Sequence, residues 1–124
     1  AWRRMLDAGV VVANGSDFPV ELSNPFHGLY ASVTRQGRDG EPAGGWYADQ
    51  ALTRAETLHS FTLAAAYAAH QEDRLGSLEP GKWADFIVID RDYFTCPASE
   101  IDDIVVLETW VAGKKMFDRK DLIE

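Results

Sequence analysis

The sequence predicts an α/β fold, and three observations support this prediction. Residues 2–8 have a short helical pattern that stops at Gly9, and residues 10–13 then form a continuous apolar run. An apolar run without polar alternation is typical of a strand covered on both faces, as in parallel sheets. The clearest helix begins at Thr53, and after residue 76 the pattern changes to short runs rich in β-branched residues, which predict strands.

The segment SNPFHGLYASVTR predicts a second helix. Ser23 or Asn24 can cap this helix, and Pro25 suits its first helical position. Apolar residues then recur at helical spacing up to Arg35. Residues 36–49 are rich in glycine and charged residues, so we expect a loop there.

A capping box marks the start of the third helix. Thr53 and Glu56 have the spacing at which the hydroxyl and the carboxylate each accept a hydrogen bond from a backbone N–H at the helix start. Apolar and alanine residues then recur at helical spacing until the pattern gives way near His70. We expect one helix over this stretch, packed closely against another element through its small residues.

The last part of the chain predicts a turn and a set of strands. Residues 79–82, Glu-Pro-Gly-Lys, suit a type II turn, because proline stands second and glycine stands third, where φ is positive. Residues 86–89 and 104–111 are rich in β-branched and aromatic residues, so we expect strands there. Residues 112–113, Ala-Gly, can turn the second of these strands into residues 114–117 as a hairpin.

These changes of pattern divide the chain near residue 76. Residues 1–75 form the predicted α/β part, and residues 76–124 form the predicted small β part. The chain begins at Ala1 and enters helical sequence at once, so we expect a piece of a longer polypeptide.

Composition and charge argue against several kinds of partner. The chain has 124 residues, of which 46% are hydrophobic and 26% are charged, as in a folded globular domain. Its net charge of −8 argues against nucleic acid, because phosphate contacts need clustered Lys and Arg. No apolar run is long enough to span a bilayer, so we expect no membrane partner. The single cysteine, Cys96, allows no internal disulfide and fits a reducing cytoplasm.

Several motifs occur in an order that resembles a known enzyme family. A GSDFPV segment is followed by a helix ending in VTR, by the helix LTRAETLHSFTLAAAYAA, and then by LGSLEPGKWADFIVIDRD and TWVAGKK. This order resembles the C-terminal end of metal-dependent hydrolases of the amidohydrolase superfamily. Within the superfamily it is most similar to the amidohydrolase-3 group, which includes enzymes like N-substituted formamide deformylase. The resemblance covers essentially the whole chain.

The resemblance implies a specific architecture. The family fold is a TIM (β/α)8 barrel with a β-sandwich built from segments on both sides of the barrel in the sequence. Residues 10–14 would then be the eighth barrel strand, and residues 1–75 would contain the last strand–helix unit. Residues 76–124 would supply the C-terminal strands of the sandwich. Asp17 would lie just past the eighth strand, at the barrel face where such enzymes carry their catalytic groups.

The resemblance also implies a role for Asp17 as a catalytic residue and metal ligand. In the superfamily the aspartate after the eighth strand acts on a metal-bound water and often contacts the metal. A divalent metal, with zinc expected here, lowers the pKa of bound water to roughly 7. A carboxylate beside that water can take its proton and pass it to the departing nitrogen. From the residues alone, Asp17 could instead be a turn or helix-capping residue.

Other candidate residues surround this aspartate in the sequence. Phe18 and Val20 flank it and could line a substrate pocket, although they could equally be packing residues. His27 stands in the first turn of the second helix and could approach a substrate. His59 and His70, by contrast, are expected to be packing or surface residues.

The chain cannot build the family's metal site by itself. Its three histidines form no His-x-His pair, and zinc needs three or four protein ligands. We therefore expect the remaining ligands to come from outside this chain, and the chain alone to be inactive.

Two interpretations of function follow. In the first, the chain is the C-terminal part of a metal-dependent amidohydrolase that hydrolyses a C–N bond of a small amide-type substrate other than a peptide. In the second, it is a non-catalytic assembly or oligomerisation module. Both predict a protein partner, either the remainder of the parent polypeptide or a second copy of the chain, because an apolar strand without neighbours leaves its edges unpaired.

Overall fold

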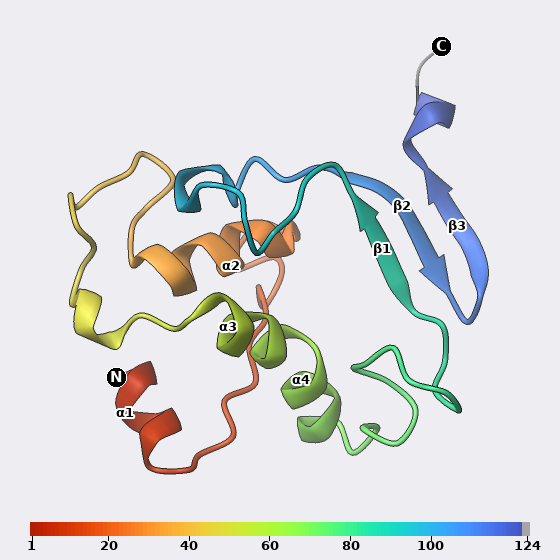
Figure 1. Ribbon diagram of the computed structural model, residues 1–124, viewed down its shortest axis with the longest axis horizontal. Coiled ribbons are helices and arrows are strands. Elements are labelled where there is room, and N and C mark those ends of the chain that lie inside the picture. Colours follow the sequence, from red (N-terminus) through yellow and green to blue (C-terminus); the bar gives the residue numbers. More distant parts are fainter. Residues whose placement is uncertain (123–124) are drawn as a thin grey trace.

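The computed structural model describes residues 1–122 and shows helices at the N-terminal side and one antiparallel sheet at the C-terminal side (Figure 1). The α-helices are α1 (Trp2–Asp7), α2 (Pro25–Thr34), α3 (Arg54–Phe61) and α4 (Leu63–Ala68). The strands are β1 (Phe86–Ile89), β2 (Val106–Val111) and β3 (Lys114–Asp118). Short 3-10 helices are η1 (Ala48–Gln50), η2 (Ala98–Glu100) and η3 (Arg119–Leu122). The predicted α/β class is therefore confirmed.

The second predicted helix forms as expected. Asn24 is the N-cap of α2, and its side chain accepts a hydrogen bond from the Phe26 N–H at 3.0 Å. Pro25 stands at the first helical position, and Arg35 ends the helix in the left-handed conformation with φ of 58°. Local capping chemistry thus sets both bounds of this helix.

The capping box of α3 is also present. The Thr53 hydroxyl accepts from the Glu56 N–H at 3.2 Å, and the Glu56 carboxylate accepts from the Thr53 N–H at 2.9 Å. The same carboxylate accepts from Arg3 at 2.7 Å. This ion pair connects α1 with the start of α3.

The long third helix of the prediction is broken into two. Between α3 and α4, Thr62 has φ of −122° and ψ of −90°, which are not helical values. At this break the Ser60 carbonyl accepts from the Asn14 N–H at 2.9 Å. The Thr62 hydroxyl donates to the Leu58 carbonyl at 2.7 Å, a side-chain bond of the type that bends helices.

The sheet has the strand order β1-β2-β3, and both pairings are antiparallel. The turn before β1 has the expected geometry, because the Lys82 N–H donates to the Glu79 carbonyl at 3.1 Å and Gly81 has φ of 93°. Ala112 and Gly113 have φ of 50° and 75°, as a two-residue hairpin turn between β2 and β3 requires. The predicted turn and hairpin are therefore confirmed.

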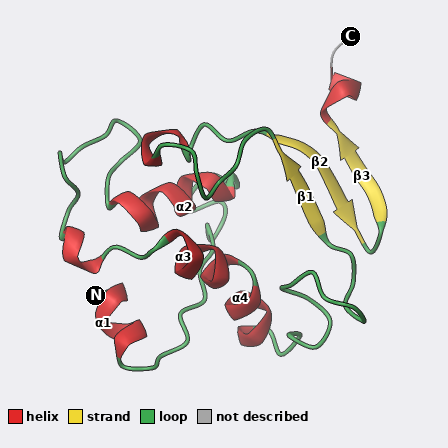
Figure 2. Ribbon diagram, in the orientation of Figure 1, coloured by secondary structure: helices red, strands yellow, loops and turns green. Residues whose placement is uncertain are grey.

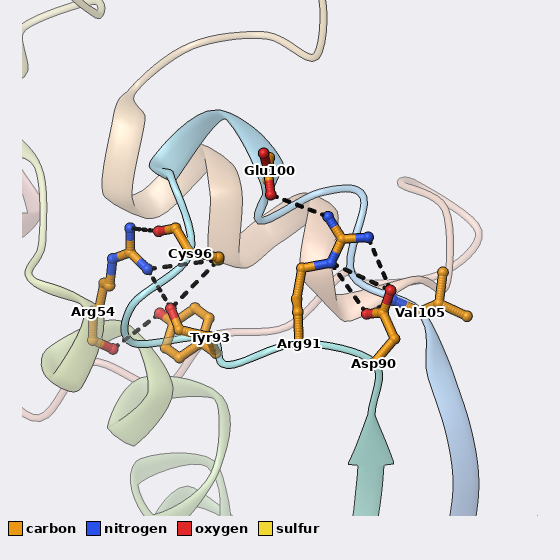
Figure 3. Close-up of polar contacts among 7 residues, drawn as sticks. All are labelled: Arg54, Asp90, Arg91, Tyr93, Cys96, Glu100 and Val105. Carbon is orange, nitrogen blue, oxygen red and sulfur yellow. Dashed lines mark hydrogen bonds and ion pairs between the residues drawn. The ribbon is translucent and has the colours of Figure 1, made fainter.

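One buried core joins the helical part to the segment between β1 and β2. It contains apolar residues of α2 and of the loop around η2, namely Phe26, Leu29, Tyr30, Tyr93, Ile101 and Ile104. Polar contacts strengthen the same junction (Figure 3). Arg54 of α3 donates to the carbonyls of Tyr93 and Cys96, and the Tyr93 hydroxyl donates to the Arg54 carbonyl at 3.0 Å. The division of the chain near residue 76 stays a prediction.

The predicted strand at residues 10–14 is not observed. These residues lie in the loop between α1 and α2 (Figure 2). A strand requires a hydrogen-bonded neighbour, and none of β1, β2 and β3 pairs with this segment. Among the described residues, the backbone N–H groups of Val11, Val12 and Ala13 have no hydrogen-bond partner. Val10 and Val11 are 45% and 53% exposed, so their apolar side chains are not covered by this chain.

None of the helices formed by residues 1–122 combines the length and the apolar character needed to cross a bilayer.

Candidate functional site

Asp17 stands at the tip of a loop between the valine run and α2. It has φ of 50°, a left-handed conformation that Asp tolerates better than most residues. Its carbonyl accepts from the Val20 N–H at 2.8 Å, and the Ser16 carbonyl accepts from the Glu21 N–H at 3.3 Å. The Phe18–Pro19 peptide bond within this turn is cis. A tight turn therefore holds the Asp17 backbone in place.

The Asp17 side chain is exposed. Within residues 1–122, no hydrogen bond or ion pair reaches its carboxylate, and the helix that follows is capped by Asn24 instead. Asp17 thus occupies a turn, which was the alternative role expected from the residues alone. However, its side chain neither accepts a hydrogen bond within this turn nor caps the helix. The carboxylate is available to a group outside this chain.

Exposed apolar side chains follow Asp17 along the same loop. Phe18 is 65% exposed, Val20 is 73% exposed and Leu22 is 60% exposed. These values are inconsistent with packing roles for Phe18 and Val20 inside this chain. The loop therefore presents the Asp17 carboxylate next to exposed apolar side chains, with a second exposed carboxylate at Glu21.

A cavity of about 620 Å³ lies between this loop and α2. Its lining includes Ser16, Glu21 and Leu22 from the loop, and Asn24 and His27 from the start of α2. His27 is half-buried there. The residues that line the cavity do not include Asp17, Phe18 or Val20. The structure thus places His27 in the wall of this cavity, whereas the other three candidates are exposed and do not line it.

Asn24 and His27 form a pair at the cavity wall. The Asn24 Nδ2 lies 3.2 Å from the His27 Nε2. The sequence predicts Asn24 as a helix cap, and this second contact was not expected from it. The Asn-Pro-Phe-His spacing was the available signal, because residues three apart lie on the same face at a helix start.

The described residues do not hold a metal by themselves. Residues 1–122 contain no group of three or more His, Cys, Asp or Glu side chains that could bind one. A single carboxylate such as that of Asp17 fits one position of a metal site, which needs further ligands. His59 and His70 are exposed and lie outside the cavity behind the loop.

The clearly shifted pKa values lie away from this loop. The hydrogen bond from Arg3 lowers the pKa of Glu56 from 4.5 to about 2, with further help from the Thr53 N–H. Burial raises the pKa of Tyr93 to about 12. The hydrogen bonds from Arg91 and from the Val105 N–H lower the pKa of Asp90 (Figure 3). These groups stabilise the junctions between elements.

The α/β architecture and the exposed carboxylate after an apolar run are compatible with the hydrolase family that the sequence resembles. Residues 1–117 match the family described as Amidohydrolase family, and the chain belongs to it. The chain is 36% identical over 117 residues to N-substituted formamide deformylase of Arthrobacter pascens, which covers 94% of this chain. It is 31% identical over 122 residues to an imidazolonepropionase of Bdellovibrio bacteriovorus, which covers 93% of this chain.

A solved structure has the same fold over most of the chain. The crystal structure of an amidohydrolase from Thermotoga maritima MSB8 matches 94% of this chain with a TM-score of 0.63 and 25% identity. The chain spans 21% of the deformylase, 24% of the imidazolonepropionase and 25% of the Thermotoga chain. It therefore corresponds to about a quarter or less of the length of these relatives.

Proposed function

We propose that this chain acts as the C-terminal part of a metal-dependent hydrolase that cleaves a C–N bond other than a peptide bond, and that Asp17 is its catalytic contribution. The observation that carries the proposal is the position and the exposure of the Asp17 carboxylate. It is exposed and unpaired within residues 1–122, and a turn positions it directly after the valine run of a chain that belongs to the Amidohydrolase family. The names of two relatives describe a formamide deformylase and an imidazolonepropionase.

The valine run supports a place for this chain inside a larger barrel. Val10 and Val11 are exposed, and within residues 1–122 the N–H groups of residues 11–13 have no hydrogen-bond partner. A strand whose neighbouring strands belong to another segment would have these two properties. We assign those neighbours to the remainder of the polypeptide, with residues 10–14 as the eighth strand of a TIM barrel. The three-stranded sheet is then the C-terminal share of a β-sandwich.

In the assembled enzyme, Asp17 would hold and move one proton. Asp17 would be one ligand of a divalent metal, with zinc expected, and such a metal would lower the pKa of a bound water to roughly 7. The Asp17 carboxylate accepts a proton from the attacking water and donates it to the departing nitrogen. Because the chain offers only one such ligand, its other metal ligands must come from the remainder of the polypeptide.

The apolar surface around Asp17 suits a small amide-type substrate. Phe18 and Val20 are exposed beside the carboxylate, and burying such side chains against an apolar substituent is favourable. His27 would contact a more distant part of the substrate through the cavity. We expect the enzyme to act in the cytoplasm.

The test compares the intact polypeptide with the isolated chain. Both are assayed for hydrolysis of a panel of N-substituted formamides and cyclic amides, with and without a metal chelator. The proposal expects turnover by the intact polypeptide that the chelator abolishes, and no turnover by residues 1–124 alone. Chelator-sensitive turnover by the isolated chain would contradict the proposal. An intact polypeptide without hydrolase activity would favour the assembly module.

A further inference from the structure

The orientation of the Asn24 side chain is fixed by its cap. Its Oδ1 accepts from the Phe26 N–H at 3.0 Å, and a backbone N–H can only donate. The atom at this position must therefore be the amide oxygen, which settles the usual ambiguity between the oxygen and the nitrogen of an Asn side chain. It follows that the other atom, at 3.2 Å from the His27 Nε2, is the NH2 group.

This orientation determines which nitrogen of a neutral His27 carries the proton. An amide NH2 group has no acceptor, so the His27 Nε2 must accept the hydrogen bond. In a neutral imidazole the proton then resides on Nδ1. Among residues 1–122, no hydrogen bond reaches this Nδ1, although the side chain is half-buried in the wall of a cavity of about 620 Å³. His27 therefore has an unused N–H donor.

We propose that Asn24 is a positioning residue that holds His27 as an Nδ1–H donor, and that this donor binds an acceptor oxygen of the substrate outside the reacting amide. The inference rests on the proposed function and adds a specificity element to it. The group bound in the cavity is distinct from the reacting amide, because Asp17 is not part of the cavity lining. An uncharged oxygen fits best, because the cavity is lined by one carboxylate and one guanidinium, those of Glu21 and Arg38. The Arg38 guanidinium also forms an ion pair with Asp102, in which Nε lies 3.6 Å from Oδ2.

The first test reads the tautomer directly, without any activity. The intact polypeptide is labelled with 15N-histidine, and its imidazole signals are recorded at mildly alkaline pH, with the loss of signals in His27→Leu used for assignment. The wild type should show the Nδ1–H tautomer. Asn24→Ser keeps a capping oxygen but removes the donor, and Asn24→Asp keeps the cap but replaces the donor with an acceptor. Both variants should show the Nε2–H tautomer, and an Nε2–H tautomer in the wild type would overturn the proposal.

The second test measures specificity. Two amide substrates are compared. One carries a carbonyl group on the substituent outside the reacting amide, and the other has a methylene group in its place. His27→Leu should raise KM about tenfold for the substrate with this oxygen, in keeping with one lost hydrogen bond. The variant should therefore no longer prefer this substrate over the other. His27→Asn places an amide nitrogen near the position of Nδ1 and should restore the preference.

The two tests separate this proposal from the proposed function. Equal effects of His27→Leu on both substrates would refute the specificity role, even if the enzyme is active. If the intact polypeptide hydrolyses no amide at all, the proposed function fails and the substrate part of the inference fails with it. The tautomer result would still decide the role of Asn24.

Discussion

The ion pair between Arg3 and Glu56 predicts a pH-dependent contribution to stability. The Glu56 carboxylate accepts from Arg3 at 2.7 Å, and its side chain is 34% exposed. Replacing Glu56 with Gln removes the charge but preserves the capping box, because Gln at this position can accept from the same backbone N–H. The variant therefore isolates the electrostatic contribution.

The magnitude follows from the pKa shift. The pKa of Glu56 is lowered from 4.5 to about 2, and each pKa unit corresponds to about 1.4 kcal/mol. The full shift would be worth about 3 kcal/mol, but solvent screens a pair that is one-third exposed, so we expect about 1 kcal/mol. Because the folded pKa is depressed, this stabilisation is present above about pH 4.5 and is lost as the pH falls toward 2.

The assay is urea denaturation of the wild type, Glu56→Gln and Arg3→Met, followed by circular dichroism. The measurements use one protein concentration, because association shifts apparent stability by mass action. At pH 7 Glu56→Gln should lose about 1 kcal/mol, Arg3→Met should also be less stable than the wild type, and the difference between Glu56→Gln and the wild type should shrink as the pH falls through about 2. Equal stability of Glu56→Gln and the wild type at pH 7 would show that the ion pair contributes nothing, and a difference of the same size at pH 2 would show that the contribution is not electrostatic.

Three further predictions concern packing and association. Ile101 is fully buried, so Ile101→Ala should lower the free energy of unfolding by about 2–5 kcal/mol in urea denaturation. As a control, Leu78→Ala should have little effect, because Leu78 is exposed. Gly76 has φ of 90°, and an added Cβ would lie 2.8 Å from the Leu63 Cα, so Gly76→Ala should destabilise by more than about 1 kcal/mol; a neutral result would show that α4 shifts freely. The isolated chain should associate through its uncovered valine run, and a compact, well-behaved monomer in sedimentation would contradict this.

The elements that the sequence predicted correctly depend on contacts between near neighbours. The cap of α2 at Asn24, the capping box of Thr53 and Glu56, and the turn at residues 79–82 each involve groups within three positions of one another. Such contacts are encoded in short stretches of sequence, so pattern and spacing are sufficient to find them.

Two of the features that the sequence did not predict involve segments far apart in the sequence. The break between α3 and α4 involves the Asn14 N–H, which binds the Ser60 carbonyl from another part of the chain. The strand expected at residues 10–14 is absent because none of the strands in the described residues pairs with this segment. The contact between Asn24 and His27 was missed for a different reason, since the same side chain also serves as a cap.

The catalytic role of Asp17 is tested by the turnover of an Asp17→Asn variant of the intact polypeptide, measured together with its metal content. Asp73→Asn, which removes an exposed carboxylate elsewhere on the chain, serves as the matched control. We predict that Asp17→Asn retains bound metal while kcat/KM falls by a factor of about 10²–10⁴, the range for loss of a general acid–base group. The control should keep the wild-type rate. Unchanged turnover of Asp17→Asn would show that this carboxylate transfers no proton in the reaction.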